Sequence, residues 1–227
     1  MEIADRITVL RNGRVVGTTT PSQTTPAELA AMMVGRHVDL IVHKESITPG
    51  EVVLEVKDLQ VLDDRQNLAV HGISFEVRER EILGIAGVQG NGQTELVEAL
   101  TGLRPVFAGE IRILDTPVTN VNPRRILEKG VAHVPEDRQR DGLVLSRPVH
   151  DNLVLCTYYL PPFAKGINIQ EDTIIATATK LVEEFDVRTP SVFVPTSTLS
   201  GGNQQKVIVA REFSRPVKLI IAAQPTR

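Results

Sequence analysis

The sequence feature that most constrains the fold is a glycine-rich run at residues 87–94, between an apolar segment and a helix-like segment. The run reads Gly-Val-Gln-Gly-Asn-Gly-Gln-Thr and fits the phosphate-loop pattern G-x-x-x-x-G-K-[ST] at every fixed position except the lysine, which is Gln93. Residues 81–86 have the apolar character of a strand, and residues 94–103 favour a helix. A strand, a glycine-rich loop and a helix in this order predict an α/β fold with an anion site at the loop.

A second glycine turn lies at residues 199–205, which read Leu-Ser-Gly-Gly-Asn-Gln-Gln. Two glycines after Ser200 let backbone N–H groups approach an anion closely. The Gln204–Phe213 stretch predicts a helix, and its N-terminus adds the positive end of a dipole. An ordinary helix start would have the same sequence, so this run alone leaves both interpretations open.

Together and in this order, the two loops resemble those of ATP-binding-cassette ATPases, in which an LSGGQ-type signature reaches the nucleotide held by a partner's phosphate loop. The resemblance implies a P-loop NTPase core with a parallel sheet, an antiparallel β appendage and a helical subdomain over about residues 146–205. It also implies ATP and Mg²⁺ as ligands. The positions that it assigns to nucleotide binding are Gly87, Gly90, Asn91, Gly92, Gln93, Thr94, Ser200, Gly201, Gly202 and Gln204.

Three positions depart from the family pattern. The phosphate-loop lysine is Gln93, and residues 219–226, which resemble the Walker B run, hold Ala223 and Gln224 where the family has the magnesium aspartate and the catalytic glutamate. A neutral Gln93 forfeits on the order of 1 kcal/mol of phosphate binding. Alanine cannot hold Mg²⁺ and glutamine cannot act as a general base, although Thr94 keeps a hydroxyl for the metal. The resemblance therefore implies a site of the ABC transporter ATPases in which hydrolysis is impaired.

Residues 134–143, VPEDRQRDGL, closely resemble the second nucleotide-binding half of importers for simple sugars and nucleosides. They place Glu136 at the family's Q-loop glutamine, although their alternating charges also fit a solvated turn. Further along, one face of a predicted helix is apolar, as expected for the helical subdomain that docks on membrane subunits in this family. That face consists of Ile174, Ile175, Ala178, Leu181, Val182 and Phe185.

The order of elements predicts three parts. Residues 1–18 form a hairpin that turns at Asn12-Gly13 and resembles the end of a preceding nucleotide-binding domain. Residues 19–50 form a linker with a short helix after Pro26, and residues 51–227 form a second nucleotide-binding domain. This domain is expected to be incomplete and C-terminally truncated, because the family's D-loop, switch histidine and final strands would follow. The hairpin either fills the vacant sheet edge or stays loosely attached.

Composition limits the possible partners. A net charge of −3 with scattered basic residues gives no footprint for nucleic acid. The single cysteine, Cys156, lies in an apolar run that favours a buried structural thiol, and each histidine is expected at the surface or in packing. No run approaches the roughly 18 apolar residues that cross a bilayer. The expected location is therefore cytoplasmic, peripheral on the cytoplasmic face of the membrane and held there by a partner.

The leading functional hypothesis is the second, catalytically degenerate half of the ATP-binding subunit of an importer for simple sugars or nucleosides. It would supply its signature loop to the ATP site of a first nucleotide-binding half. The implied partners are that half, membrane permease subunits and, indirectly, an extracellular substrate-binding protein. The alternative is a structural or regulatory module that docks on the permease without binding nucleotide productively. A complete ATPase acting alone is disfavoured by Ala223 and Gln224.

Overall fold

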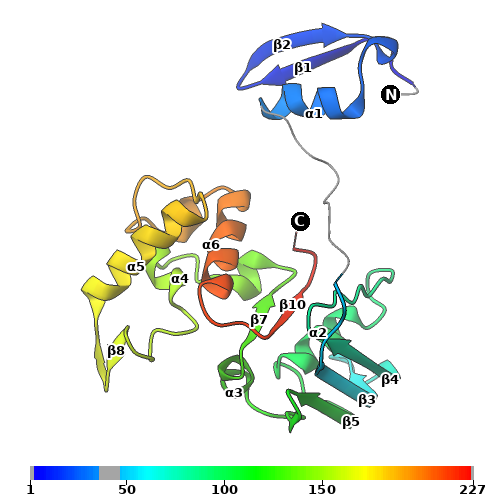
Figure 1. Cartoon of the computed structure of the whole chain (residues 1–227), viewed down its shortest axis with the longest axis vertical. Coiled ribbons are helices and arrows are strands. Elements are labelled where there is room, and N and C mark those ends of the chain that lie inside the picture. The colour runs from blue at the N-terminus through cyan, green and yellow to red at the C-terminus, as the bar shows by residue number, and fades with distance from the viewer. Residues whose placement is uncertain (1–2, 36–46, 226–227) are drawn as a thin grey trace. The chain divides into compact units, whose positions relative to one another are not determined.

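The structure is a computed structural model that describes residues 3–35 and 47–225, in two compact units divided between Ile47 and Thr48. Residues 36–46 of the predicted linker lie outside the described residues. The first unit contains the predicted hairpin, with β1 (Ile7–Arg11) antiparallel to β2 (Arg14–Thr19) (Figure 1). Asn12 and Gly13 both have positive φ, at 52° and 73°, as a two-residue type I′ turn requires.

A short helix follows the hairpin, as predicted. After the 3₁₀ turn η1 (Pro21–Gln23), α1 spans Pro26–Val34. Thr25 accepts a hydrogen bond from the backbone of Glu28, whose side chain bonds back to the backbone of Thr25, and this reciprocal pair caps the helix start. Gly35 ends the helix in the left-handed conformation, where glycine has no steric penalty.

The second unit begins with an antiparallel sheet of strand order β4-β3-β5-β6, which is the predicted β appendage. Its strands are β3 (Val52–Leu62), β4 (Leu68–Arg78), β5 (Val106–Ile113) and β6 (Thr116–Pro117). One face of the sheet forms a core with α2 (Gln93–Leu100), in which Leu59, Ile111 and Ile113 are fully buried. This packing places the start of α2, and with it the phosphate loop, beside β4.

A parallel pair of strands completes the α/β arrangement. Strand β7 (Val131–Val134) follows α3 (Pro123–Glu128) and pairs with β10 (Leu219–Ala222) from Val131↔Leu219 to Val134↔Ala222. Val131 belongs to the core under the antiparallel sheet, whereas Val134 belongs to the helical core described next. Strand β7 therefore connects the two packed regions of this unit.

The helical part contains α4 (Val149–Leu153), α5 (Glu171–Glu184) and α6 (Gly201–Phe213), which lie together in Figure 1. Shorter elements between them are β8 (Ala164–Lys165), β9 (Asn168–Ile169) and the 3₁₀ turn η3 (Thr196–Thr198). The predicted apolar face is confirmed, because five of its six residues pack into one core and the sixth, Ile174, is also buried. Phe185, the last of the five, is the C-cap of α5. Within the described ranges, no helix is long and apolar enough to cross a membrane.

The strand predicted at residues 81–86 is wrong, since this segment has no strand structure. A tight turn after β4 redirects the chain: Glu81 N donates to the Arg78 carbonyl, and the Glu81 carboxylate accepts from Arg78 N. Arg80, inside the turn, has a φ of 63°. Residues 81–91 are all exposed, including Ile82 and Ile85. An apolar run predicts a strand only if a neighbouring strand pairs with it, and here the turn ends the pairing.

Candidate functional site

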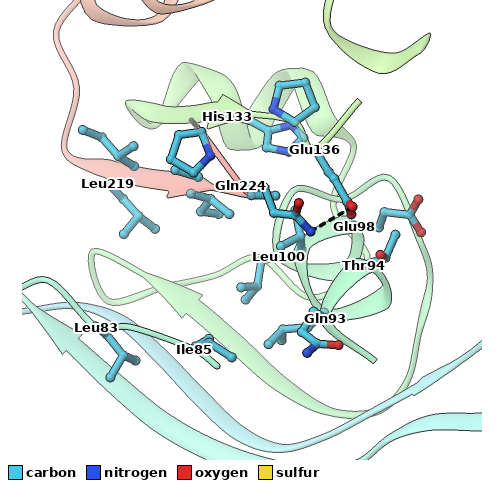
Figure 2. Close-up of a pocket in the computed structure, with 18 of the residues that line it drawn as sticks. Leu83, Ile85, Gln93, Thr94, Glu98, Leu100, His133, Glu136, Leu219 and Gln224 are labelled. Carbon is cyan, nitrogen blue, oxygen red and sulfur yellow. Dashed lines mark hydrogen bonds between the residues drawn. The ribbon is translucent and has the colours of Figure 1, made fainter. Parts of the chain in front are cut away.

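A cavity of about 1670 Å³ lies between the phosphate loop, the start of α2 and the ends of β7 and β10. In Figure 2, Gln93 and Thr94 stand at one side of it, Leu83 and Ile85 lie nearby, and Glu136 and Gln224 face each other at another side. Seven of the predicted positions line this one cavity although they are far apart in sequence. They are Gly87, Gly90, Gln93, Thr94, Glu136, Ala223 and Gln224.

Glycines give the phosphate loop its shape. Gly90 and Gly92 have φ values of 88° and 89°, in the region that favours glycine. Gly92 also lies against β4, where a Cβ atom would come within 2.5 Å of the Ala69 carbonyl oxygen. Asn91 N donates to the Val88 carbonyl at 3.3 Å and closes the turn. Asn91 and Gly92 therefore shape the loop without lining the cavity, whereas Gly87 and Gly90 belong to the cavity wall.

Gln93 folds back over the loop. Its Nε2 donates to the Val88 carbonyl at 3.3 Å, and the same amide packs so closely on Gly87 that a Cβ atom there would clash with it. The Gln93 amide has two N–H donors, so the bond to Val88 leaves one for a phosphate oxygen, but neither donor carries a positive charge. The position can therefore contact phosphate, but more weakly than a lysine.

Glu136 and Gln224 form a hydrogen-bonded pair, in which Gln224 Nε2 donates to Glu136 Oε1 at 2.9 Å (Figure 2). The pairing of β10 with β7 extends by one more hydrogen bond, in which Ala223 N donates to the Val134 carbonyl at 2.9 Å. The next residue, Gln224, has a φ of 45°. Relative to the pattern that the sequence resemblance implies, the amide and the carboxylate have changed places. The carboxylate of the pair is at Glu136, and the side chain at position 224 is an amide donor.

Carboxylates line the cavity, but they are not grouped as ligands of a metal ion. Among the described residues, no group of three or more His, Cys, Asp or Glu side chains could hold one. The Thr94 hydroxyl and the Glu136 carboxylate line the cavity and are oxygen ligands of the kind Mg²⁺ prefers, whereas Ala223 contributes none. Mg²⁺ commonly binds through one or two protein oxygens together with substrate phosphates. The residues present therefore fit Mg²⁺ that is held mainly by a bound nucleotide.

The signature turn forms the start of α6, which begins three residues earlier than predicted. Ser200 is the N-cap, and Gly201 and Gly202 form the first turn, whose N–H groups have no acceptor within the helix. The space beside Gly202 is open, whereas the Arg138 guanidinium covers Gly201. These three residues do not line the cavity that contains the phosphate loop. The turn is thus a candidate anion site that lies apart from that cavity.

Gln204, predicted as a nucleotide ligand, points into the protein. It is 2% exposed, its Oε1 accepts from Gln139 Nε2 at 3.0 Å, and its Nε2 donates to the Thr196 carbonyl at 3.2 Å. A nucleotide contact through this side chain would require both bonds to break. The sequence indicated the helix but carried no signal for Gln139, which lies 65 positions away from its partner.

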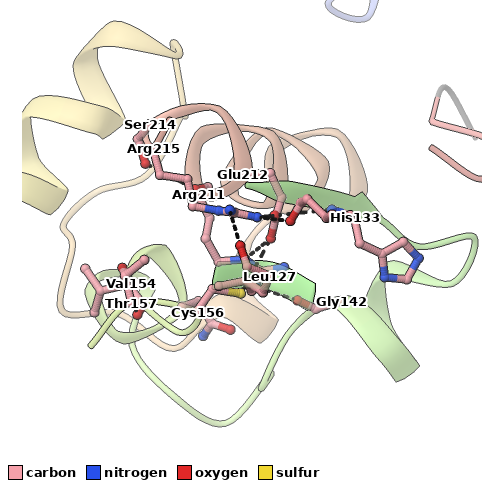
Figure 3. Close-up of polar contacts among 12 residues, drawn as sticks. Leu127, His133, Gly142, Val154, Cys156, Thr157, Arg211, Glu212, Ser214 and Arg215 are labelled. Carbon is pink, nitrogen blue, oxygen red and sulfur yellow. Dashed lines mark hydrogen bonds and ion pairs between the residues drawn. The ribbon is translucent and has the colours of Figure 1, made fainter. Parts of the chain in front are cut away.

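Sequence reasoning also missed a buried ionic cluster around Glu212, shown in Figure 3. Glu212 is 2% exposed and accepts from Arg211 Nε and Arg215 Nη2, both at 2.9 Å, and from His133 N at 3.3 Å. Burial favours the neutral acid, but the charge of Arg211 and the bonds from both arginines outweigh it, so the pKa of Glu212 is lowered. Arg211 also donates to the Gly142 carbonyl at 2.8 Å. The cluster fixes the end of α6 against β7 and against the turn at residues 138–142 that follows β7.

Two further side chains lie beside this cluster: Cys156, which is poorly reactive, and His133, which is neutral. Burial raises the pKa of the Cys156 thiol, whose sulfur contacts Glu212 Oε1 at 3.6 Å, so Cys156 is a weak nucleophile. Burial lowers the pKa of His133, which lines the cavity and whose Nε2 has no hydrogen-bond partner. His133 therefore presents a neutral ring to the cavity near pH 7.

Comparisons with known proteins agree with this geometry. A sequence model of the ABC transporter family matches residues 70–227. The nucleoside import ATP-binding protein NupA of Lactococcus lactis subsp. cremoris is 50% identical over 225 residues, covering 99% of this chain and 44% of that protein. The guanosine import ATP-binding protein NupO of Bacillus subtilis is 44% identical, and the glucose import ATP-binding protein TsgD13 of Haloferax volcanii is 43% identical. The chain covers 44% and 41% of these two proteins, and thus less than half of each relative.

Solved structures share the fold at low sequence identity. A nucleotide-free ATP-binding cassette from an ABC transporter superposes with a TM-score of 0.63 at 21% identity, covering 78% of this chain and 70% of that chain. A dimeric cassette in a post-hydrolysis state bound to ADP and Pi gives 0.62 at 18% identity, covering 76% and 74%. Both matches support the P-loop NTPase architecture.

Proposed function

Because the chain belongs to the ABC transporter family, we propose that it is part of the ATP-binding subunit of an importer for nucleosides or simple sugars. The 50% identity to a nucleoside import protein, against 43% to a glucose import protein, supports a nucleoside as cargo. On this proposal the chain works on the cytoplasmic side of the membrane. Its partners are a first nucleotide-binding half, permease subunits and, indirectly, an extracellular substrate-binding protein.

The cavity is proposed to be the degenerate one of two ATP sites. The observation that carries this part is the bond from Gln224 to Glu136, because it places an amide donor where hydrolysis would need a base. Ala223 removes a metal ligand, and Gln93 removes the cation that would stabilise developing charge on the phosphate. ATP with Mg²⁺ is expected to bind here weakly and to remain unhydrolysed.

The signature turn is proposed to complete the ATP site of the first half. Ser200 and the N–H groups of Gly201 and Gly202 stand at a helix start, which favours anions, and lie apart from the chain's own cavity; both facts support a role toward a nucleotide held by another domain. In the complete subunit these groups would contact the γ-phosphate and stabilise the charge that develops during hydrolysis.

A substitution at Gly201 tests this role. In the complete subunit assembled with its permease, Gly201→Asp places a carboxylate at the turn, beside Arg138 and the phosphate, and is expected to lower ATP hydrolysis at least about 100-fold. Asn168→Asp adds the same charge on the exposed hairpin β8–β9 and is expected to leave the rate unchanged. If Gly201→Asp hydrolyses ATP at the wild-type rate, this turn does not complete a partner site.

The second candidate function, a docking module without productive nucleotide binding, is favoured by the bond that Gln93 makes to Val88 inside the loop. A titration of the chain with fluorescent ATP in the presence of Mg²⁺ separates the two functions. Saturable binding without phosphate release supports the degenerate ATP site. Absence of binding at millimolar ATP supports the docking module.

A further inference from the structure

Two glutamines that follow the signature glycines each bond to a segment of the cavity wall. The first is Gln204, whose buried Oε1 accepts from Gln139 at 3.0 Å. Gln139 lies three residues after Glu136, in the π-helical turn η2 (Arg138–Gly142), and residues 138–141 of this turn also line the cavity. This bond joins the first turn of α6 to the segment that carries Glu136.

The second link runs through Gln205, whose Nε2 donates to the Pro225 carbonyl at 3.1 Å. Pro225 follows Gln224, which in turn donates to Glu136 at 2.9 Å. The two links therefore meet at the cavity, because the segments that they hold are themselves bonded to each other. These three hydrogen bonds, joined by short pieces of backbone, form a closed circuit between the cavity wall and α6, the signature helix.

The orientation of the buried amide is fixed. Gln204 Nε2 donates to the Thr196 carbonyl, so a flipped amide would place its oxygen against that carbonyl and lose both bonds. Gln139 must consequently act as the donor in its bond to Gln204. A side chain at position 139 that cannot donate would break the circuit.

Turn η2 also contacts α6 at both ends of the helix. At the start of α6, the Arg138 guanidinium covers Gly201. Toward the end of α6, the Gly142 carbonyl accepts from Arg211 at 2.8 Å, and there is no room for a Cβ atom on Gly142 beside Ile208. A displacement of η2 would therefore disturb contacts near both ends of α6.

We propose that Gln139, Gln204 and Gln205 are positioning residues that set the signature turn relative to the cavity. A change at the Glu136–Gln224 pair shifts the segments that Gln139 and Pro225 carry, and the two glutamines of α6 pass this shift to the turn. The consequence for hydrolysis rests on the proposed function, because it requires the turn to contact a partner's phosphate. The mechanical link itself does not depend on that function.

The link is tested on the chain by hydrogen–deuterium exchange of the amides at residues 204–208. Loss of one hydrogen bond in Gln139→Ala or Gln205→Ala is expected to speed exchange about fivefold. Gln224→Ala, at the far end of the circuit, is expected to do the same. Arg140→Ala is the matched control, because Arg140 lies in the same turn and its side chain is 81% exposed. Unchanged exchange in Gln139→Ala and Gln205→Ala would overturn the proposal.

Two variants of similar size separate positioning from a general loss of packing. Gln139→Lys keeps an N–H donor for Gln204 and is expected to exchange like wild type, whereas Gln139→Glu lacks the donor and is expected to exchange like Gln139→Ala. In the complete subunit, Gln139→Glu is expected to lower kcat about fivefold with KM for ATP unchanged. Equal behaviour of the lysine and glutamate variants contradicts the proposal.

The outcomes also distinguish this inference from the proposed function. If Gly201→Asp abolishes hydrolysis but Gln139→Glu leaves exchange and kcat unchanged, the positioning role fails and the proposed function stands. If Gln139→Glu speeds exchange but Gly201→Asp is active, the link stands and the turn does not serve a partner site.

Discussion

The two glycine turns of this chain contain similar residues but differ in what holds them. Residues 81–91, which lead into the phosphate loop and form its first half, are exposed throughout and leave β4 by a tight turn. The signature turn starts a helix whose side chains Gln204, Arg211 and Glu212 are buried and hydrogen-bonded to distant segments. The signature turn is therefore pre-organised by the fold, whereas the phosphate loop depends more on what it binds. This difference agrees with a chain that supplies one loop to a partner and retains a weak site of its own.

The largest expected effect on the difference between the two turns comes from removing the Glu212 carboxylate, which holds α6 in place. Glu212→Ala leaves Arg211 and Arg215 buried without their partner and is expected to lower the free energy of unfolding by about 3–5 kcal/mol. Urea denaturation measures it. Glu184→Ala, at an exposed position on α5, is the control and is expected to change stability by less than about 0.5 kcal/mol. A loss as small as the control's would mean that the cluster does not hold the helix.

Lowering the pH should reduce the stability that the Glu212 cluster contributes. Because the pKa of Glu212 lies below its ordinary value of 4.5, the unfolded chain takes up a proton at a higher pH than the folded chain does. The stabilisation is therefore fully present above about pH 4.5 and is lost as the pH falls through the folded-state pKa. Free energies of unfolding between pH 7 and pH 3 test this. Glu212→Gln is expected to show a shallower decline, and an identical decline would contradict the assignment.

At the cavity, the Glu136–Gln224 pair is tested by exchanging its members. Gln224→Glu places two carboxylates against each other and is expected to lower Tm by about 2–4 °C at pH 8. The double variant Glu136→Gln, Gln224→Glu restores one amide and one carboxylate, and most of the loss should return. Scanning calorimetry compares the four proteins. If the double variant is as unstable as the sum of the single variants, the two side chains do not interact.

The smallest expected effect concerns the phosphate loop alone. Gln93→Lys introduces a charge-assisted bond and is expected to tighten ATP binding up to about fivefold without starting hydrolysis, since Ala223 and Gln224 remain. Gln93→Met has similar length and no polar group, so it should bind no better than wild type. Isothermal titration with a phosphate-release assay gives both results. Steady turnover in Gln93→Lys would show that the cavity is not catalytically degenerate.

Prediction from sequence succeeded where the signal is local. The apolar face of α5 and the type I′ turn at Asn12-Gly13 follow from spacing and from backbone preferences within a few residues. The strand expected at residues 81–86 failed because strands need a partner, and the turn at Arg78–Glu81 removes it. The partners of Gln204 and Glu212 could not be predicted, since Gln139 and His133 lie 65 and 79 positions away and contact them only in the folded chain.

The exposed segment that leads into the phosphate loop and includes its first residues has a practical consequence for anyone who handles this protein. Ile82, Leu83, Ile85 and Val88 present apolar side chains to water within a short stretch that contains no proline. Stretches of this kind are those from which unwanted association between chains begins. Concentrated stocks should consequently turn cloudy sooner than dilute ones, and storage with a saturating nucleotide or a mild detergent should delay the clouding.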